Sequence, residues 1–127
     1  MTALILDTGA FIAIEGNDRS TVALLKAAQR NSLSLRSNGG VVAEVWRGGS
    51  GSQVPLARLL GAVELLPVDG DLGRVAGVLI RVAGGGSAID ATVVSIAREG
   101  DRIVTSDQND IQALVNFSGR GIKIISC

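Results

Sequence analysis

The sequence predicts an α/β protein in which helices cover both faces of a mostly parallel central sheet. Short apolar runs that suit buried strands alternate with longer segments whose apolar residues recur at helical spacing. The sequence also lacks the tandem hairpin signals that are typical of antiparallel sheets. Because the chain has 127 residues, no internal repeat and no linker-like segment, we expect residues 1–127 to form a single domain.

The N-terminal part of the chain is expected to contain a buried strand and two helices. The apolar run over residues 3–6 predicts the strand, and Phe11 and Ile14 then follow at helical spacing. A second helix should begin at Asp18 or Ser20, because either side chain can accept a hydrogen bond from a free N–H at a helix start. This helix should run through Arg30.

The middle of the chain has four expected elements. Asn38 is a favourable N-cap, and the glycine and serine residues at 48–52 should form a mobile loop. Pro67 has no backbone N–H, so the strand that contains it should be short or lie at an edge. In chain order we expect a weak strand over 32–36, a helix from Asn38 to the loop, a helical segment over 55–61, and a strand over 63–68.

The C-terminal part contains the clearest helix, over residues 71–83, where apolar residues recur on one face and three glycines follow. Ser87 should open another helix that stops at Gly100, ahead of an apolar strand at residues 103–104. A further helix and a strand over 122–125 complete the expected fold.

The composition restricts the available chemistry. Histidine is absent, which excludes Ser-His and Cys-His catalytic pairs and the usual zinc ligand. Cys127 is the single cysteine, so it forms no internal disulfide and no thiolate cluster. The 12 basic and 12 acidic residues cancel, so bulk attraction for nucleic acid is not expected. Without a basic n-region or an apolar run near the roughly 18 residues of a membrane span, we expect a cytoplasmic protein that makes no membrane contact.

Four carboxylates are expected to converge at one edge of the sheet. Asp7 and Asp107 follow strands, and the carboxyl ends of parallel strands face a common crevice. Glu44 and Asp90 lie in helices that can lean over the same crevice. Two like charges about 4 Å apart repel by about 4 kcal/mol at an effective dielectric near 20. Such a cluster favours a hard divalent cation such as Mg²⁺, and therefore chemistry on phosphate esters.

Each carboxylate also has an ordinary structural interpretation. Asp90 fits a capping box in which its carboxylate accepts a hydrogen bond from the Ser87 N–H. Asp107 fits an N-cap, and Asp110 is favoured in the first turn of the same helix by the helix dipole. Glu44 fits a solvated helix position. Asp7 is harder to explain in this way, because a carboxylate directly after a buried strand needs a partner or an ion.

Four segments resemble, in their order and spacing, the motifs of the PIN-domain family and most closely its compact VapC-like toxins. The segments are 4–10 with Asp7, 41–45 with Glu44, 88–92 with Asp90, and 103–110 with Asp107. The resemblance covers nearly the whole chain. It implies an endoribonuclease in which Asp7, Asp90 and Asp107 hold Mg²⁺ or Mn²⁺, Glu44 supports the site or orients water, and Asp110 is a further ligand. It also implies a homodimer and a cognate antitoxin that blocks the site.

Other residues and other functions remain open. Thr8 and Thr105 are candidates either for holding nearby carboxylates or for local capping. Arg36 and Arg47 are candidates for contacts with RNA phosphates, although ordinary surface solvation is the simpler explanation. The alternative functions are an inactive PIN scaffold that binds RNA or a protein, and an aspartate-based phosphotransfer domain. Gly9 weakens the second alternative, because it removes a dehalogenase-like Asp-x-Asp.

Overall fold

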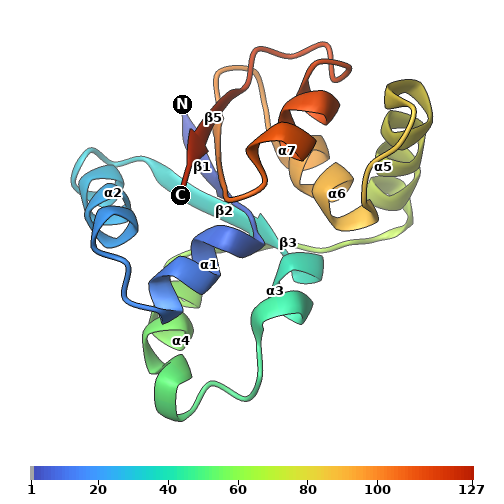
Figure 1. The fold of residues 1–127 in the computed structure, drawn as a ribbon. Helices are drawn as coiled ribbons and strands as arrows, with labels where there is room; N and C mark the ends of the chain where they lie inside the picture. Colours follow the sequence, from blue (N-terminus) through green and yellow to red (C-terminus); the bar gives the residue numbers. More distant parts are fainter. Residues whose placement is uncertain (1) are drawn as a thin grey trace.

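Five strands form one sheet in which every strand pair is parallel (Figure 1). The computed structural model describes residues 2–127. Along the sheet the order is β3-β2-β1-β4-β5. The expected α/β class with a parallel sheet is confirmed. The strands are β1 (Ala3–Leu6), β2 (Ser34–Asn38), β3 (Glu64–Leu66), β4 (Arg102–Thr105) and β5 (Lys123–Ser126).

The chain reverses its direction of travel across the sheet between β1 and β4. From β1 it proceeds outward to β2 and β3, and it then returns to β4 and proceeds outward to β5 on the other side. The two central strands pair directly, with Leu6 opposite Val104. In open α/β sheets, ligands bind beyond the carboxyl ends of the strands at such a switch point. The residues that follow β1 and β4 are therefore the best-placed candidates for a site.

Two groups of helices flank the sheet. One group packs around α1, which contacts α2, α3 and α4, while α5, α6 and α7 pack against one another on the other side (Figure 1). The expected cover on both faces is therefore confirmed. The helices are α1 (Thr8–Glu15), α2 (Arg19–Arg30), α3 (Gly39–Val45), α4 (Val54–Leu60), α5 (Gly70–Ala83), α6 (Ala88–Ile96) and α7 (Gln108–Val115), with a short 3-10 helix η1 (Gly51–Gln53) before α4.

The centre of the sheet is the most deeply buried part of the protein. All four residues of β1 are buried, as are Ile103 and Val104 of β4 and the aromatic ring of Phe11 in α1. Interiors packed in this way change shape little, so the ends of β1 and β4 are held rigidly relative to each other.

Several element boundaries differ from the sequence expectation, and two of them show a clear structural reason. Strand β2 begins at Ser34 instead of residue 32, because residues 32 and 33 complete the turn that ends α2: Leu33 N–H donates to Ala28 O (2.9 Å), and Ser32 has a positive φ. Helix α6 ends at Ile96 instead of Gly100. The Arg120 guanidinium bonds the carbonyls of its last turn, and Asp101 Oδ2 accepts from Arg98 N–H (2.8 Å). Both side chains come from later in the sequence, so local pattern does not reveal them.

The loop between α3 and α4 is anchored by Gln53. Its Oε1 accepts from the N–H groups of Arg47 (2.7 Å) and Gly49 (3.2 Å), and its Nε2 donates to Val45 O (2.8 Å). The expected mobility of residues 48–52 stays a prediction. The expectation of a short or edge strand near Pro67 is confirmed, because β3 is both short and at the edge of the sheet.

Helix α5 is amphipathic, but part of its apolar surface is exposed. Ala76 and Leu79 are buried, whereas Val75, Val78 and Val82 are 54%, 62% and 56% exposed. No single helix within residues 2–127 has the length and apolar character needed to cross a membrane, and α5 and α6 meet that test only as a pair bent by 109°. The three exposed valines form a stripe on a surface helix.

Candidate metal centre

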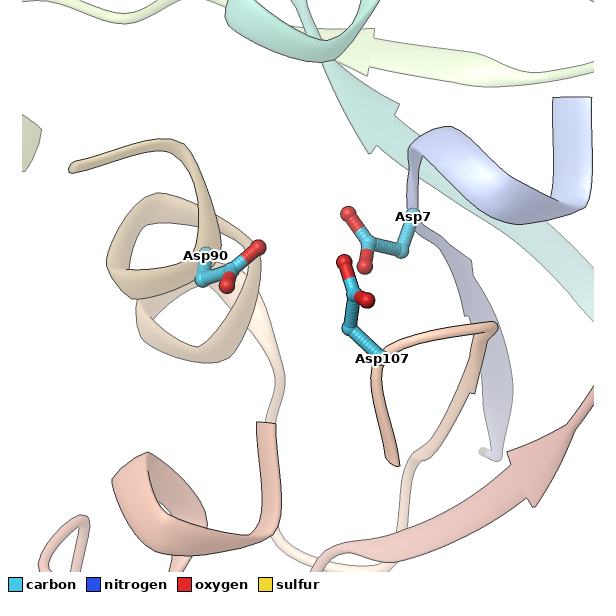
Figure 2. Close-up of side chains that lie close together, drawn as sticks. All are labelled: Asp7, Asp90 and Asp107. Carbon is cyan, nitrogen blue, oxygen red and sulfur yellow. The ribbon is translucent and has the colours of Figure 1, made fainter. Parts of the chain in front are cut away.

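Three aspartates meet at the switch point of the sheet. Asp7, Asp90 and Asp107 each offer a carboxylate oxygen, and these oxygens lie within 4.8 Å of one another (Figure 2). Asp7 follows β1, Asp90 lies in the first turn of α6, and Asp107 precedes α7. The expected convergence of carboxylates is therefore found for these three residues.

Asp7 is buried, and both of its carboxylate oxygens accept hydrogen bonds. Only 2% of the residue is exposed. Oδ1 accepts from Thr8 N–H (2.8 Å), and Oδ2 accepts from the Thr105 hydroxyl (2.7 Å). Burial raises the pKa of Asp7, the two hydrogen bonds oppose this rise, and the charges of Asp107 and Glu44 add to it. The carboxylate is thus held in one orientation at some electrostatic cost.

Thr105, the last residue of β4, connects two of the aspartates. Its buried hydroxyl donates to Asp7 and accepts from Asp107 N–H (2.9 Å). Thr8 plays a similar part on the other side, where its hydroxyl donates to Glu44 Oε1 (3.1 Å). The prediction that both threonines hydrogen-bond nearby carboxylates is confirmed.

Asp90 extends its side chain toward the other two aspartates (Figure 2). Its own N–H donates to Ser87 Oγ (3.0 Å), so Ser87 caps α6 as expected. The other half of the capping box, from Ser87 N–H to the Asp90 carboxylate, is not formed among the hydrogen bonds of residues 2–127. Burial, followed by the charge of Asp7, raises the pKa of Asp90 to about 6; the Ser87 side chain opposes this rise, and the charges of Asp107 and Asp110 add to it.

Asp107 is exposed and occupies the N-cap position of α7, yet its side chain makes no capping hydrogen bond. The interpretation of Asp107 as a side-chain cap is therefore wrong. Its backbone N–H bonds Thr105, which directs the carboxylate toward Asp7 and Asp90 instead of the helix start (Figure 2).

Glu44 and Asp110 lie beside the three aspartates without joining their cluster. Glu44 is an exposed residue of α3, close enough to affect the pKa of Asp7. Asp110, in the first turn of α7, lines a hollow of about 340 Å³ together with Asp90. Both therefore extend the negative surface around the cluster.

Within the described residues 2–127, no basic side chain forms an ion pair with the three aspartates. The ion pairs formed within residues 2–127 are Arg36–Glu64, Arg36–Asp101 and Arg74–Asp71, and none of them involves the cluster. Carboxylate oxygens without histidine or thiolate ligands suit a hard cation such as Mg²⁺ or Mn²⁺, which would relieve the mutual repulsion of the three carboxylates. The residues present thus fit the metal that the sequence predicts.

The two candidate arginines are placed differently from each other. Arg36 is only 7% exposed and pairs with Glu64 (3.0 Å) and Asp101 (3.4 Å), so it is neither solvated nor available to RNA. The physical reason is that Asp101 is buried and needs a compensating charge. Arg47 is exposed, bonds Ala43 O (3.2 Å), and lines with Glu44 a hollow of about 420 Å³.

Gly9 is a site residue that sequence analysis missed. A Cβ atom at this position would lie 2.2 Å from Ser106 Oγ and 2.9 Å from Ser106 N. The start of α1 therefore approaches the turn between β4 and α7 so closely that only glycine fits. The available signal was a glycine in the first turn of a helix, directly after Asp7 and Thr8, where glycine is otherwise unfavourable.

Comparison with known proteins places this arrangement in a known fold. No protein-family model matches the sequence, and no curated protein matches it significantly. Solved structures do match over almost the whole chain. The chain has a PIN-like α/β fold, and the expected resemblance is confirmed at the level of the fold.

Two of these structures are DNA-bound complexes that are named VapBC2 and VapBC. A chain of VapBC2 from Rickettsia felis, bound to a DNA fragment from its promoter, matches with a TM-score of 0.71 and 14% identity, covering 98% of this chain and 99% of that chain. A chain of DNA-bound VapBC from Salmonella typhimurium matches with a TM-score of 0.63 and 18% identity, covering 98% of both chains. At these identities the likeness concerns the fold.

Proposed function

We propose that this chain is a Mg²⁺- or Mn²⁺-dependent endoribonuclease that hydrolyses RNA phosphodiester bonds. The observation that carries the proposal is the unneutralised cluster of Asp7, Asp90 and Asp107 at the switch point of the sheet. Carboxylate clusters of this kind hold hard cations that in turn bind phosphate groups. The PIN-like fold and the lack of any histidine agree with such a site.

The roles proposed for the residues follow from their positions. Asp7, Asp90 and Asp107 hold the metal, with Thr105 fixing the orientation of Asp7. A bound divalent ion supplies an acidified water and stabilises negative charge on the phosphodiester oxygens. Glu44, which the Thr8 hydroxyl orients, supports the site or positions the attacking water, and Asp110 extends the ligand set.

The proposal extends to the biological setting, in which the chain is the toxin of a VapBC-type pair and binds a cognate antitoxin as a homodimer. Support comes from the match over 98% of this chain to chains of complexes that are named VapBC. We propose a cytoplasmic location, as expected for an enzyme whose substrate is cellular RNA.

The test is cleavage of total RNA by the purified protein freed of any antitoxin. We expect cleavage in Mg²⁺ or Mn²⁺ and none in excess EDTA. The matched variants are Asp107→Asn, which removes one cluster charge, and Asp69→Asn, which changes an N-cap of α5 outside the site. Asp107→Asn should lower the rate by orders of magnitude, while Asp69→Asn should leave it unchanged. Undiminished cleavage in EDTA would contradict the metal mechanism, and RNA binding without cleavage would indicate an inactive scaffold.

A further inference from the structure

A buried side chain, Asn38, connects the two helices that carry Glu44 and Asp90. Asn38 is the last residue of β2 and is fully buried. Its Oδ1 caps α3 by accepting from the N–H groups of Gly40 (2.9 Å) and Val41 (3.1 Å). Its Nδ2 donates to the Thr92 hydroxyl of α6 (3.1 Å). One amide therefore holds α3 and α6 in a fixed relation.

The direction of this hydrogen-bond chain is unambiguous. Two backbone N–H groups require the amide oxygen to face α3, which leaves the NH₂ group to face α6. The Thr92 hydroxyl uses its proton to donate to Ile89 O (2.7 Å), so it accepts from Asn38. This series of hydrogen bonds thus ends at the carbonyl of Ile89, the residue directly before Asp90.

Close packing surrounds the same connection. A Cβ atom at Gly40 would lie 2.8 Å from Ile89 Cδ1, so the first turn of α3 is pressed against the first turn of α6. Thr92 is itself buried. A bond in such a tightly packed contact governs how far the two helices stand apart, because neither helix can approach further.

Asp90 depends on this contact more than the other aspartates do. Asp7 and Asp107 follow the paired strands β1 and β4 and are connected through Thr105. Asp90 instead comes from a helix that packs on β2, the strand that ends at Asn38. We infer that Asn38 is a positioning residue that, through Thr92, sets the distance of Asp90 from Asp7 and Asp107. This inference rests on the proposed metal site.

This role predicts an effect on the choice of metal as well as on its affinity. Mg²⁺ requires near-ideal octahedral geometry at about 2.0–2.1 Å, whereas Ca²⁺ accepts flexible geometry at about 2.3–2.6 Å. A loosened Asp90 therefore penalises Mg²⁺ more than Ca²⁺. A residue that only stabilised the fold would not change the ratio of the two affinities.

The experiment measures Mg²⁺ and Ca²⁺ binding by calorimetry to folded, full-length protein, well below its melting temperature. Asn38→Ser keeps a good N-cap for α3 but is too short to reach Thr92, and Thr92→Val keeps the shape of the side chain without the hydroxyl. Thr92→Ser retains the hydroxyl. Ser95→Ala is the matched control, because it removes a hydroxyl of α6 that bonds only within that helix, to Ala91 O.

We expect Asn38→Ser and Thr92→Val each to weaken Mg²⁺ binding by about tenfold, the range known for residues that orient metal ligands, with a smaller loss for Ca²⁺. The double variant should be no worse than either single one, because both break the same bond. Thr92→Ser and Ser95→Ala should bind Mg²⁺ and Ca²⁺ with the affinities of the wild type. If the ratio of Mg²⁺ affinity to Ca²⁺ affinity were unchanged in both Asn38→Ser and Thr92→Val, the positioning role would be overturned while the proposed metal site would stand. Wild-type protein that bound neither ion would overturn the proposed metal site and this role with it.

Discussion

Asp90 is the residue whose ionisation should be easiest to observe. Its pKa in the folded protein is about 6, mainly because of burial and the charge of Asp7, against an ordinary value of 3.8. The folded state therefore binds this proton more tightly than the unfolded state does. In metal-free protein, the resulting stability is present below about pH 4 and is lost as the pH rises through 6.

Replacing Asp90 with asparagine should consequently stabilise the metal-free protein at pH 8, by on the order of 1 kcal/mol after allowance for solvent screening. The gain should disappear near pH 4, where the wild-type carboxyl is already protonated. Melting temperatures in EDTA at the two pH values measure this, and the same variant should lose nuclease activity in Mg²⁺. As a control, Asp71→Asn removes an exposed first-turn charge from α5 and should show no such gain. An Asp90→Asn protein that was destabilised yet fully active would remove Asp90 from the site.

Gly9 should be intolerant of even the smallest side chain. In Gly9→Ala the new methyl group would meet the backbone and side chain of Ser106, which must then shift together with the neighbouring Asp107. We expect a loss of stability of about 1–3 kcal/mol, as for other overpacked sites, together with weaker metal binding. Denaturant unfolding and calorimetry measure the two effects. Gly73→Ala in α5, where a Cβ meets open space, should instead be neutral or slightly stabilising.

The sequence was sufficient to predict Asp7, Asp90 and Asp107 as neighbours, because strand ends and helix starts converge in a parallel sheet. It was not sufficient for Arg36, whose partner Asp101 lies 65 positions away. Gly9 was missed for the same reason, since its constraint comes from Ser106. Residues defined by long-range contacts carry little local signal.

At the scale of elements, local caps made most helix starts predictable. Asp18, Asn38 and Ser87 each accept from the first turn of the helix they precede, as their residue types indicate. The end of α6 was misplaced because tertiary contacts set it, since Arg120 bonds the last carbonyls. The order of the strands could not be predicted beyond a parallel arrangement, because periodicity does not say which strands pair.

Helix α5 carries the prediction of a homodimer. Val75, Val78 and Val82 lie at helical spacing and are all more than half exposed, which leaves an apolar stripe on the surface. We expect the protein to be a dimer at micromolar concentration and Val78→Glu to shift it toward the monomer, as measured by light scattering. Gln112→Glu adds the same charge to an exposed position of α7 and should leave the mass measured by light scattering at that of the dimer. A monomeric wild type would contradict the prediction.

At the scale of the whole molecule, metal binding should stabilise the fold, because the cluster is assembled only in the folded state. A ligand at about 100 times its dissociation constant adds about 2.7 kcal/mol. We expect Mn²⁺ to raise the melting temperature of the wild type and to have little effect on Asp107→Asn, as measured by calorimetric scans. Equal shifts in both proteins would show that the ion binds elsewhere.

The direct pairing of β1 and β4 determines when the three aspartates can come together. Thr105 and Asp7, which are joined by a hydrogen bond, are 98 positions apart, and β4 inserts beside β1 only after six α-helices and three strands have been made. A chain still emerging from the ribosome thus carries Asp7 and Asp90 without the strand that brings Asp107 to them. Contacts between such distant parts of a chain form late in folding. The order of synthesis therefore postpones assembly of the three-aspartate cluster until β4 has been made, which would keep the proposed nuclease from cutting its own messenger before that point.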